Sequence, residues 1–306
     1  MKIVVLGAGG VGGYFGGRLA AGGQDVTFVA RGAHLEAIRR QGLRILSPRG
    51  DIQVFPAKAI PSIAEVEGAD LVLIGVKLWD LEGVAPTLRP LAERATAIFS
   101  PQNGVQKDEL LRRYVPPEAV MGGVCYIPAV IEAPGVIRHN GTMQRLVFGE
   151  YGGRPSARAQ AFLDACRGAG IDAELSGDVE QLIWEKFVFL VGLSGTTSFF
   201  RQPIGRVREH AASRALLLDA MREVVAVGRA RGVRLSSDFA EKQLAVSDTL
   251  PAAMTSSMHE DLERGHRLEL PWLSGGVVEM GAALGIATPA NNRITDALAP
   301  FVQGRA

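Results

Sequence analysis

Residues 1–21 read MKIVVLGAGGVGGYFGGRLAA, and this stretch decides the fold. Met1–Leu6 is typical of a short buried strand, and Tyr14–Ala21 has the composition of a helix. The glycine-rich run at 7–12 joins them with the spacing GxGxxG, which dinucleotide-binding sites place between a strand and a helix. The stretch therefore predicts a Rossmann-type domain, and the alternative is a glycine-rich turn that binds nothing.

Each glycine of the fingerprint has an expected task. Gly7 permits a sharp turn, Gly9 lets the backbone approach a pyrophosphate, and Gly12 lets the helix pack closely on the strand. The unpaired N–H groups at the helix start, at the positive end of its dipole, suit the phosphates. The cofactor-binding residues predicted in this loop are Gly7, Ala8, Gly9, Gly10, Val11 and Gly12.

The second predicted strand, Asp25–Ala30, indicates which dinucleotide binds. An NAD site usually has an acidic residue at the end of this strand, where it accepts from the ribose 2′-OH. Here the strand is followed by Arg31, whose planar cationic fork suits a 2′-phosphate. The predicted cofactor is therefore NADP(H), and the alternative is that Arg31 is a solvated loop residue.

Composition limits the class of protein. The 306 residues are 47% hydrophobic and 21% charged, which is typical of a globular enzyme with room for two domains. A net charge of +1 gives no footprint for nucleic acid. Uncharged runs are shorter than the ~20 residues of a membrane helix, so we expect no membrane span. Two cysteines without a CxxC motif favour the reducing cytoplasm, and five scattered histidines predict no metal site.

The first half of the chain alternates strand and helix patterns. Continuous apolar runs at 71–76, 96–99 and 120–127 are typical of parallel strands covered on both faces. Further elements are expected as helices at 80–92, 108–113 and 157–168, and as an edge strand at 171–175. Closing β-structure is expected at 137–151, and antiparallel pairing is one expectation for it. The alternation predicts a doubly wound sheet.

The second half has a different character. Long helical patterns replace the strands at 178–200, 213–231, 238–247 and 271–284. We therefore expect an α/β fold made of a Rossmann-type doubly wound domain at 1–176 and an all-helical domain at 177–306.

Ligands of open α/β sheets bind outside the carboxyl ends of the strands. Lys77, Asn103 and Pro128 each follow a predicted strand and are candidates for contact with the cofactor. The alternative is that Lys77 and Asn103 are solvated or cap helices.

Lys186 begins a helical stretch with no other charge before Arg201. Because a helix that is apolar nearly all round is buried, its lysine should be partly buried and a competent proton donor. Leu190 and Ser194 follow on the same face. The alternative is that Lys186 extends to solvent at the helix start.

Glu269 precedes Pro271 by two residues and so lies near a helix start, where a carboxylate is favoured. Spacing by itself would make Glu269 a capping residue and Ser257 an N-cap.

Taken together, these residues resemble the ketopantoate reductase (2-dehydropantoate 2-reductase) family along essentially the whole chain. The motifs that carry the resemblance, in order, are GAGGVGG at 7–13, GVKLWD at 75–80, QNG at 102–104, WEKF at 184–187, SSM at 256–258, Glu269, and TPANN at 288–292.

The resemblance implies NADPH-dependent reduction of ketopantoate to pantoate, on the path to pantothenate and coenzyme A, with the substrate between the two domains. It implies that Lys186 is the general acid and that Glu269 orients the reacting groups. It also places Lys77 and Asn103 against the nicotinamide, and Asn103 and Ser257 against the substrate.

The chain departs from the family in the substrate pocket. Leu190, Ser194 and Ile204 stand where family members that reduce ketopantoate carry asparagines, so they are the predicted substrate-binding positions that differ. Loss of polar partners changes specificity. The alternatives are therefore a reductase or dehydrogenase of a more apolar 2-oxo acid and, in another class, a dinucleotide sensor without catalysis. The exact substrate, the direction of reaction and the oligomeric state, for which a homodimer is one expectation, stay open.

Overall fold

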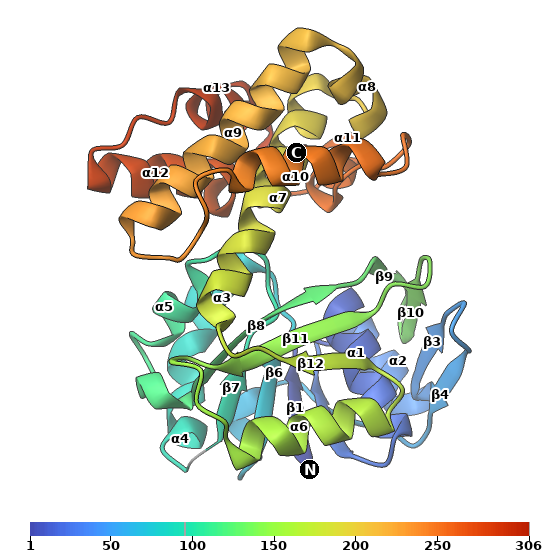
Figure 1. Ribbon diagram of the computed structural model, residues 1–306. Coiled ribbons are helices and arrows are strands. Elements are labelled where there is room, and N and C mark those ends of the chain that lie inside the picture. Colours follow the sequence, from blue (N-terminus) through green and yellow to red (C-terminus); the bar gives the residue numbers. More distant parts are fainter. Residues whose placement is uncertain (95, 306) are drawn as a thin grey trace. The chain divides into compact units, whose positions relative to one another are not determined.

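A computed structural model describes residues 1–94 and 96–305 (Figure 1). The chain divides into two compact units, Met1–Leu182 and Ile183–Ala306. The division falls inside helix α7 (Val179–Phe200), which begins in the first unit and continues into the second. The domain limits expected at residues 176 and 177 stay a prediction.

An eight-stranded sheet forms the centre of the first unit. In sheet order its strands are β12 (Asp172–Leu175), β11 (Arg145–Glu150), β8 (Val120–Tyr126), β7 (Ala97–Phe99), β6 (Leu71–Ile74), β1 (Lys2–Leu6), β2 (Asp25–Val29) and β5 (Lys58–Ile60). Every pair is parallel except β11 with β8. The predicted Rossmann-type sheet is confirmed, and it is mixed because β11 and β12 run opposite to the other six strands. All four residues of β6 are fully buried, as its continuous apolar sequence predicts.

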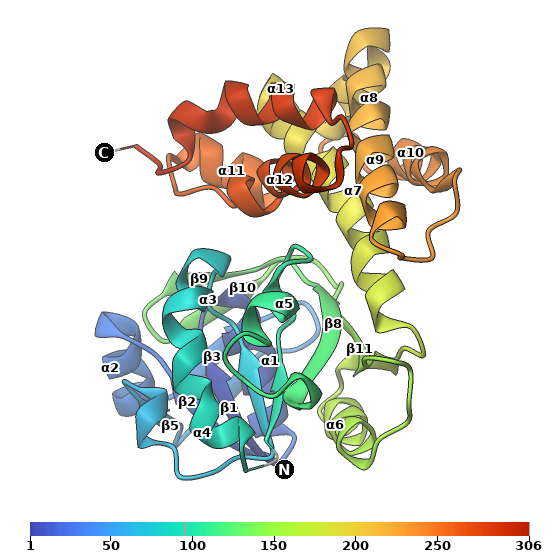
Figure 2. The same cartoon turned by 90° about the vertical axis from the view of Figure 1, so that its left-hand side faces the viewer.

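Helices cover this sheet (Figure 2). They are α1 (Gly10–Ala21), α2 (Gly32–Gln41), α3 (Leu78–Val84), α4 (Arg89–Ala92), α5 (Lys107–Leu111) and α6 (Ala157–Gly168), with 3₁₀ turns η1 (Ile63–Glu65), η2 (Ala85–Leu88) and η3 (Pro117–Ala119). The helical segment expected at 80–92 is confirmed, because residues 78–92 are helical without a break, but it is divided into α3, η2 and α4. Pro86 and Pro90 stand at the starts of η2 and α4, because proline lacks the N–H that would continue a helix through it.

A second sheet of four strands was not predicted. Its order is β4 (Ile52–Val54), β3 (Leu43–Leu46), β10 (Val136–His139) and β9 (Ala129–Ala133). It packs on α1, where a Cβ added at Gly13 would lie 2.8 Å from Ile137 and one added at Gly17 would lie 2.5 Å from Ile45. Part of the β-structure expected at 137–151 therefore belongs to this sheet and not to the main one.

The described residues of the second unit form helices and no strand, which confirms the all-helical prediction. After α7 come α8 (Ile204–Glu209), α9 (Ala211–Ala230), α10 (Phe239–Thr249), α11 (Ser257–Arg264), η4 (Leu270–Trp272), α12 (Ser274–Leu284), α13 (Pro289–Leu298) and η5 (Ala299–Phe301). The short helices α8, α11 and α13 were not anticipated. Among the described residues, the helices are too short or too polar to cross a membrane.

A buried carboxylate joins α9 to α13. Glu223, which is 8% exposed, accepts from the backbone N–H of Ala290 at 2.7 Å and of Asn291 at 2.9 Å. The side-chain amide of Asn291 also donates to Glu223, at 2.7 Å. An acidic side chain satisfies free N–H groups at a helix start and complements the helix dipole. The TPANN motif therefore forms a helix start that Glu223 caps from another helix.

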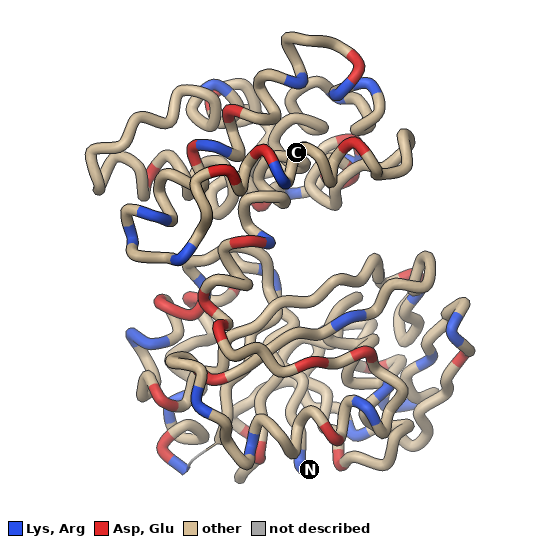
Figure 3. The backbone as a smooth tube through the Cα atoms, viewed as in Figure 1, with Lys and Arg blue, Asp and Glu red and all other residues tan. Residues whose placement is uncertain are grey.

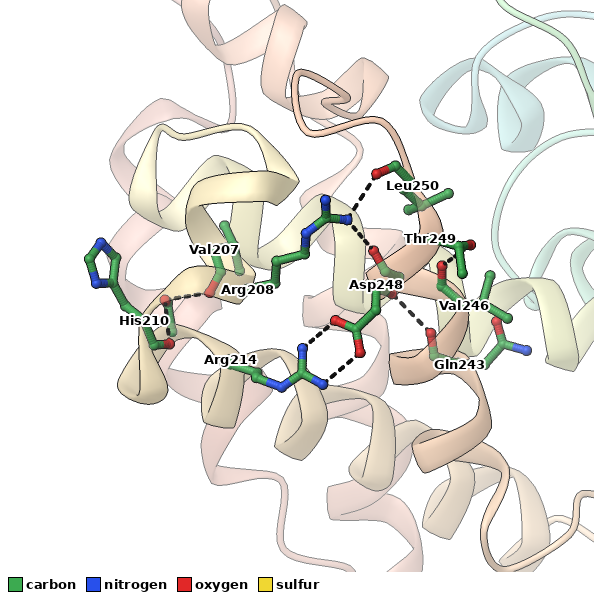
Figure 4. A network of polar contacts seen from close by, with 11 residues as sticks. Val207, Arg208, His210, Arg214, Gln243, Val246, Asp248, Thr249 and Leu250 are labelled. Atoms are coloured by element: carbon green, nitrogen blue, oxygen red, sulfur yellow. Dashed lines mark hydrogen bonds and ion pairs between the residues drawn. The ribbon is translucent and has the colours of Figure 1, made fainter.

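The first turn of α9 carries an exposed network (Figure 4). Arg214 forms a two-pronged ion pair with Asp248, and Arg208 donates to the carbonyl oxygens of Ser247 and Leu250 at 2.8 and 2.9 Å. These contacts tie α8 and α9 to the end of α10. Because the Arg214 and Asp248 side chains are 36% and 42% exposed, solvent screens their pairing.

The two carboxylates should contribute very differently to stability. Glu223→Ala leaves buried N–H donors without an acceptor, so the free energy of unfolding should fall by about 2–4 kcal/mol. Asp248→Asn disturbs an exposed pair and should cost less than about 1 kcal/mol. Urea unfolding followed by circular dichroism compares the two variants, and equal losses would contradict the assigned roles.

Candidate active site

Two glycines of the loop, Gly7 and Gly12, have no space for a side chain. Gly7 has φ +99°, and a Cβ added there would lie 2.7 Å from the Val76 nitrogen. A Cβ at Gly12 would lie 2.1 Å from the carbonyl oxygen of Gly7. The structure therefore gives Gly7 the sharp turn and Gly12 the close helix packing that the fingerprint requires.

Gly9 differs from these two glycines because a Cβ there would meet only the Gly75 oxygen, at 3.9 Å. Gly9 is the N-cap of α1, which has no side-chain cap and no acidic residue in its first turn. The free N–H groups and dipole of the helix are thus left for an anion. This open cradle fits the pyrophosphate of a dinucleotide.

The segment containing Pro128 borders the same loop. A Cβ at Gly10 would lie 2.1 Å from the carbonyl oxygen of Ala129, the first residue of β9. Pro128 is exposed, and its own carbonyl oxygen accepts from the Asn140 N–H at 2.8 Å. The structure thus brings Pro128 beside the glycine loop, as its candidacy requires.

Lys77 and Asn103 both follow strands at the carboxyl edge of the sheet. Lys77 is exposed at the start of α3, with its ammonium 5.4 Å from the centre of the Trp79 ring. Asn103 is half-buried in the loop after β7. Because β6 and β7 are adjacent and parallel, these two loops lie at the same edge.

Gln102 links the two loops, a role that the QNG motif at 102–104 did not reveal in the sequence. Its side-chain amide donates to the carbonyl oxygen of Val76 at 2.6 Å and accepts from the Ser100 hydroxyl at 2.9 Å. Gln102 thereby fixes the loop that carries Asn103 against the residue that precedes Lys77. The available signal was a polar side chain three positions after a buried strand, which ends at Phe99.

His34 is a second residue that the sequence did not reveal. Its Nδ1 accepts from the N–H of Gly135 at 3.0 Å, so Nε2 carries the proton and donates to the carbonyl oxygen of Ala8 at 2.8 Å. Burial lowers the pKa of His34 and keeps the ring neutral. The ring therefore holds the glycine loop against the turn between β9 and β10.

Arg31 lies two residues after the end of β2, at the N-cap of α2, and its side chain is 76% exposed. Its guanidinium lies 3.9 Å from the carboxylate of Asp80 on α3. Arg31 is thus available to a ligand at the edge of the sheet, and an acidic side chain stands beside it.

Lys186 lies in the third turn of α7, inside the helix expected at 178–200 and not at the helix start, where the alternative placed it. The helix begins earlier because Asp178 accepts from the Gln181 N–H at 3.1 Å and caps it. Lys186 is half-buried as expected, and its neighbours Phe187 and Val188 are fully buried. Its ammonium is thus carried on a rigid and largely apolar helix.

The predicted substrate positions differ in accessibility. Leu190 is half-buried, whereas Ser194 and Ile204 have no solvent-exposed surface. A side chain without open surface reaches a ligand only if its neighbours move. Of these three positions, Leu190 is therefore the one open to a ligand in this structure.

Ser257 is exposed in the first turn of α11, and the N-cap that spacing assigned to it is wrong. The cap is Ser256, whose hydroxyl accepts from the His259 N–H at 3.1 Å. His259 also binds the Thr197 carbonyl oxygen of α7 through Nδ1, at 2.8 Å. Since the cap is the neighbouring serine, Ser257 is left facing outward.

Glu269 is 6% exposed and stands just before η4. Its backbone carbonyl accepts from the Trp272 N–H at 3.0 Å, while its side chain makes no capping hydrogen bond. Simple capping therefore does not explain the buried carboxylate.

The fold and the glycine cradle define a dinucleotide-binding protein with a helical second unit. Its sequence matches the family model "Ketopantoate reductase PanE/ApbA" over residues 3–153 and the model of that family's C-terminal domain over residues 178–302. An uncharacterized oxidoreductase of Bacillus subtilis is 33% identical, over 94% of this chain and 95% of its own length. A 2-dehydropantoate 2-reductase of Halobacterium salinarum is 31% identical, over 97% of both chains.

Solved structures agree with this relationship. A PanE/ApbA family ketopantoate reductase of Ralstonia eutropha superimposes with a TM-score of 0.88 at 34% identity, covering 99% of this chain and 98% of that one. A D-mandelate dehydrogenase solved with NADH and anilino(oxo)acetate has the same fold, with a TM-score of 0.88 at 21% identity and coverage of 99% and 98%. The chain belongs to the ketopantoate reductase family. It is accordingly an oxidoreductase that binds a nicotinamide dinucleotide.

Two glycine variants separate binding from folding. Gly9→Ala meets no close neighbour and should keep the wild-type melting temperature. Its methyl group fills the space that a pyrophosphate would occupy, so the dinucleotide Kd should rise about tenfold or more. Gly12→Ala pushes a methyl group against backbone and should lower the melting temperature markedly. A Gly9→Ala variant that binds as tightly as wild type would place the phosphates elsewhere.

Proposed function

We propose that the protein reduces a 2-oxo acid to the 2-hydroxy acid with NADPH, and that ketopantoate is its leading substrate, giving pantoate for pantothenate and coenzyme A synthesis. The observation that carries the proposal is that the helical unit has a half-buried lysine, Lys186, and a buried carboxylate, Glu269, in a chain whose glycine cradle fits a dinucleotide. A dinucleotide sensor would need neither side chain.

The reaction adds a hydride to the substrate C2 and a proton to its oxygen, and bound NADPH supplies the hydride. Lys186 donates the proton to the developing alkoxide, and its positive charge stabilises that oxygen beforehand. Solvent then returns a proton to the lysine. Glu269 orients the reacting groups, and its burial restricts its own motion.

The remaining residues bind and orient. Lys77 and Asn103 hold the nicotinamide end, and Gln102 keeps their two loops in register. Asn103 and Ser257 contact the substrate. The exposed fork of Arg31 takes the 2′-phosphate and thereby favours NADPH.

Leu190 supports a second candidate substrate. Its aliphatic side chain, half-buried on the helix that carries Lys186, cannot hydrogen-bond to a hydroxyl or carboxylate. In such a pocket an apolar 2-oxo acid would lose less binding free energy than ketopantoate, because the hydroxyl of ketopantoate would have no partner at Leu190.

A panel of 2-oxo acids tests the substrate class. Wild-type protein should oxidise NADPH steadily with at least one of them. Leu190→Asn should raise kcat/KM for ketopantoate relative to an analogue without its hydroxyl, because the amide can pair with that group. Leu190→Met is the matched apolar control. An unchanged ratio in Leu190→Asn would remove Leu190 from the pocket, and no turnover with any acid would favour the sensor.

Replacing Lys186 tests the general acid. Lys186→Met keeps the aliphatic stem but not the ammonium, so turnover should fall about 10²–10⁴-fold while NADPH binding is nearly unchanged. Lys186→Ala should be equally impaired. Steady-state kinetics and the NADPH Kd measure the two effects, and near-normal turnover of the methionine variant would return Lys186 to a packing role.

A further inference from the structure

Arg31 and Asp80 form an ion pair, and the two residues come from opposite sides of the glycine loop. Arg31 follows β2 and Asp80 lies in the first turn of α3, which follows β6. Strand β1 lies between β2 and β6 in the sheet, and all three run parallel. The two side chains therefore reach toward one another across the end of β1, where the loop begins.

Contacts between the loops fix this arrangement. The N–H groups of Gly7 and Ala8 both donate to the Val29 carbonyl oxygen, at 3.1 and 3.2 Å. The Gly75 N–H donates to the Leu6 oxygen at 2.8 Å. The backbones that carry Arg31 and Asp80 are thus both tied to the phosphate-binding turn.

The sequence has no carboxylate at the end of β2, where dinucleotide sites place the acceptor for the ribose 2′-OH. The structure brings one there from α3. The Asp80 side chain is 38% exposed, which leaves its oxygens accessible, and it lies 3.9 Å from the guanidinium that would take a 2′-phosphate. An exposed ion pair adds little to stability, so the fold gains little from this pairing.

We propose that Asp80 is a specificity-determining residue that accepts a hydrogen bond from the ribose 2′-OH of NADH, so that the protein uses both NADH and NADPH. This inference rests on the dinucleotide site of the proposed function. A 2′-phosphate gains an ion pair with Arg31. To form that pair it must displace Asp80 from Arg31, and it then lies close to the negative charge of Asp80. Asp80 therefore limits the preference for NADPH that Arg31 creates.

Direct binding measurements test this assignment. The Kd values of NADH and NADPH are measured by fluorescence, and those of ADP and adenosine 2′,5′-bisphosphate by calorimetry. Asp80→Asn keeps an acceptor oxygen but loses the negative charge that strengthens the hydrogen bond, so the Kd values of NADH and ADP should rise about tenfold. The same variant should strengthen both 2′-phosphate ligands. Glu82→Gln is the matched control, because Glu82 is exposed on the same helix and the change removes the same charge.

Arg31→Ala separates this inference from the proposed function. It should weaken the 2′-phosphate ligands and leave NADH nearly unchanged. The role of Asp80 is overturned if Asp80→Asn and Glu82→Gln change the Kd values of all four ligands by the same factor. It is also overturned if Asp80→Asn leaves the Kd of NADH unchanged. In either case the role of Arg31 can still hold. Undiminished NADPH binding by Arg31→Ala would instead overturn the 2′-phosphate assignment.

Discussion

The contact between Gly12 and the carbonyl oxygen of Gly7 is the constraint on which the first unit depends. A Cβ at Gly12 would lie 2.1 Å from that oxygen, and a Cβ at Gly75 would lie 2.5 Å from the same atom. Three glycines from two distant segments thus press backbone against backbone. Because α1 starts this close to β1, its free N–H groups lie at the carboxyl edge of the sheet, where the loops after β2, β6 and β7 begin. The cofactor site therefore follows from the absence of side chains at Gly7, Gly12 and Gly75.

Local sequence predicted those parts of the fold that local physics determines. Leu71–Ile74 is apolar throughout and is a fully buried strand, and α6 has the predicted limits, 157–168. The pairing of β3 with β10 escaped prediction because its partners lie about ninety residues apart and each strand has only four residues. His34 and Gln102 were missed for the same reason, since their partners are backbone groups of distant loops. Acidic and basic residues are interspersed along both units (Figure 3), as the near-zero net charge of the sequence would allow.

The second unit shows the same division between periodicity and packing. Periodicity placed Lys186, Leu190 and Ser194 on one face of a buried helix, and α7 extends through all three. It could not show which neighbours cover that face, and Ser194 and Ile204 have no open surface. Between Ser256 and Ser257, the capping role depends on a single residue of offset, and the backbone at 256 is the extended one that a cap requires.

The cap that Glu223 provides has a consequence for how the chain is made. The acceptor lies on α9, and its two backbone donors follow 67 and 68 positions later. A ribosome therefore releases α9 well before the groups that satisfy its buried carboxylate exist. Until residues 290 and 291 emerge, Glu223 either stays hydrated, which keeps the helices around it apart, or is buried at a high energetic cost. The carboxylate thus makes final compaction of the helical unit wait until residues 290 and 291 have been synthesised, and a chain terminated before them would remain open to proteases.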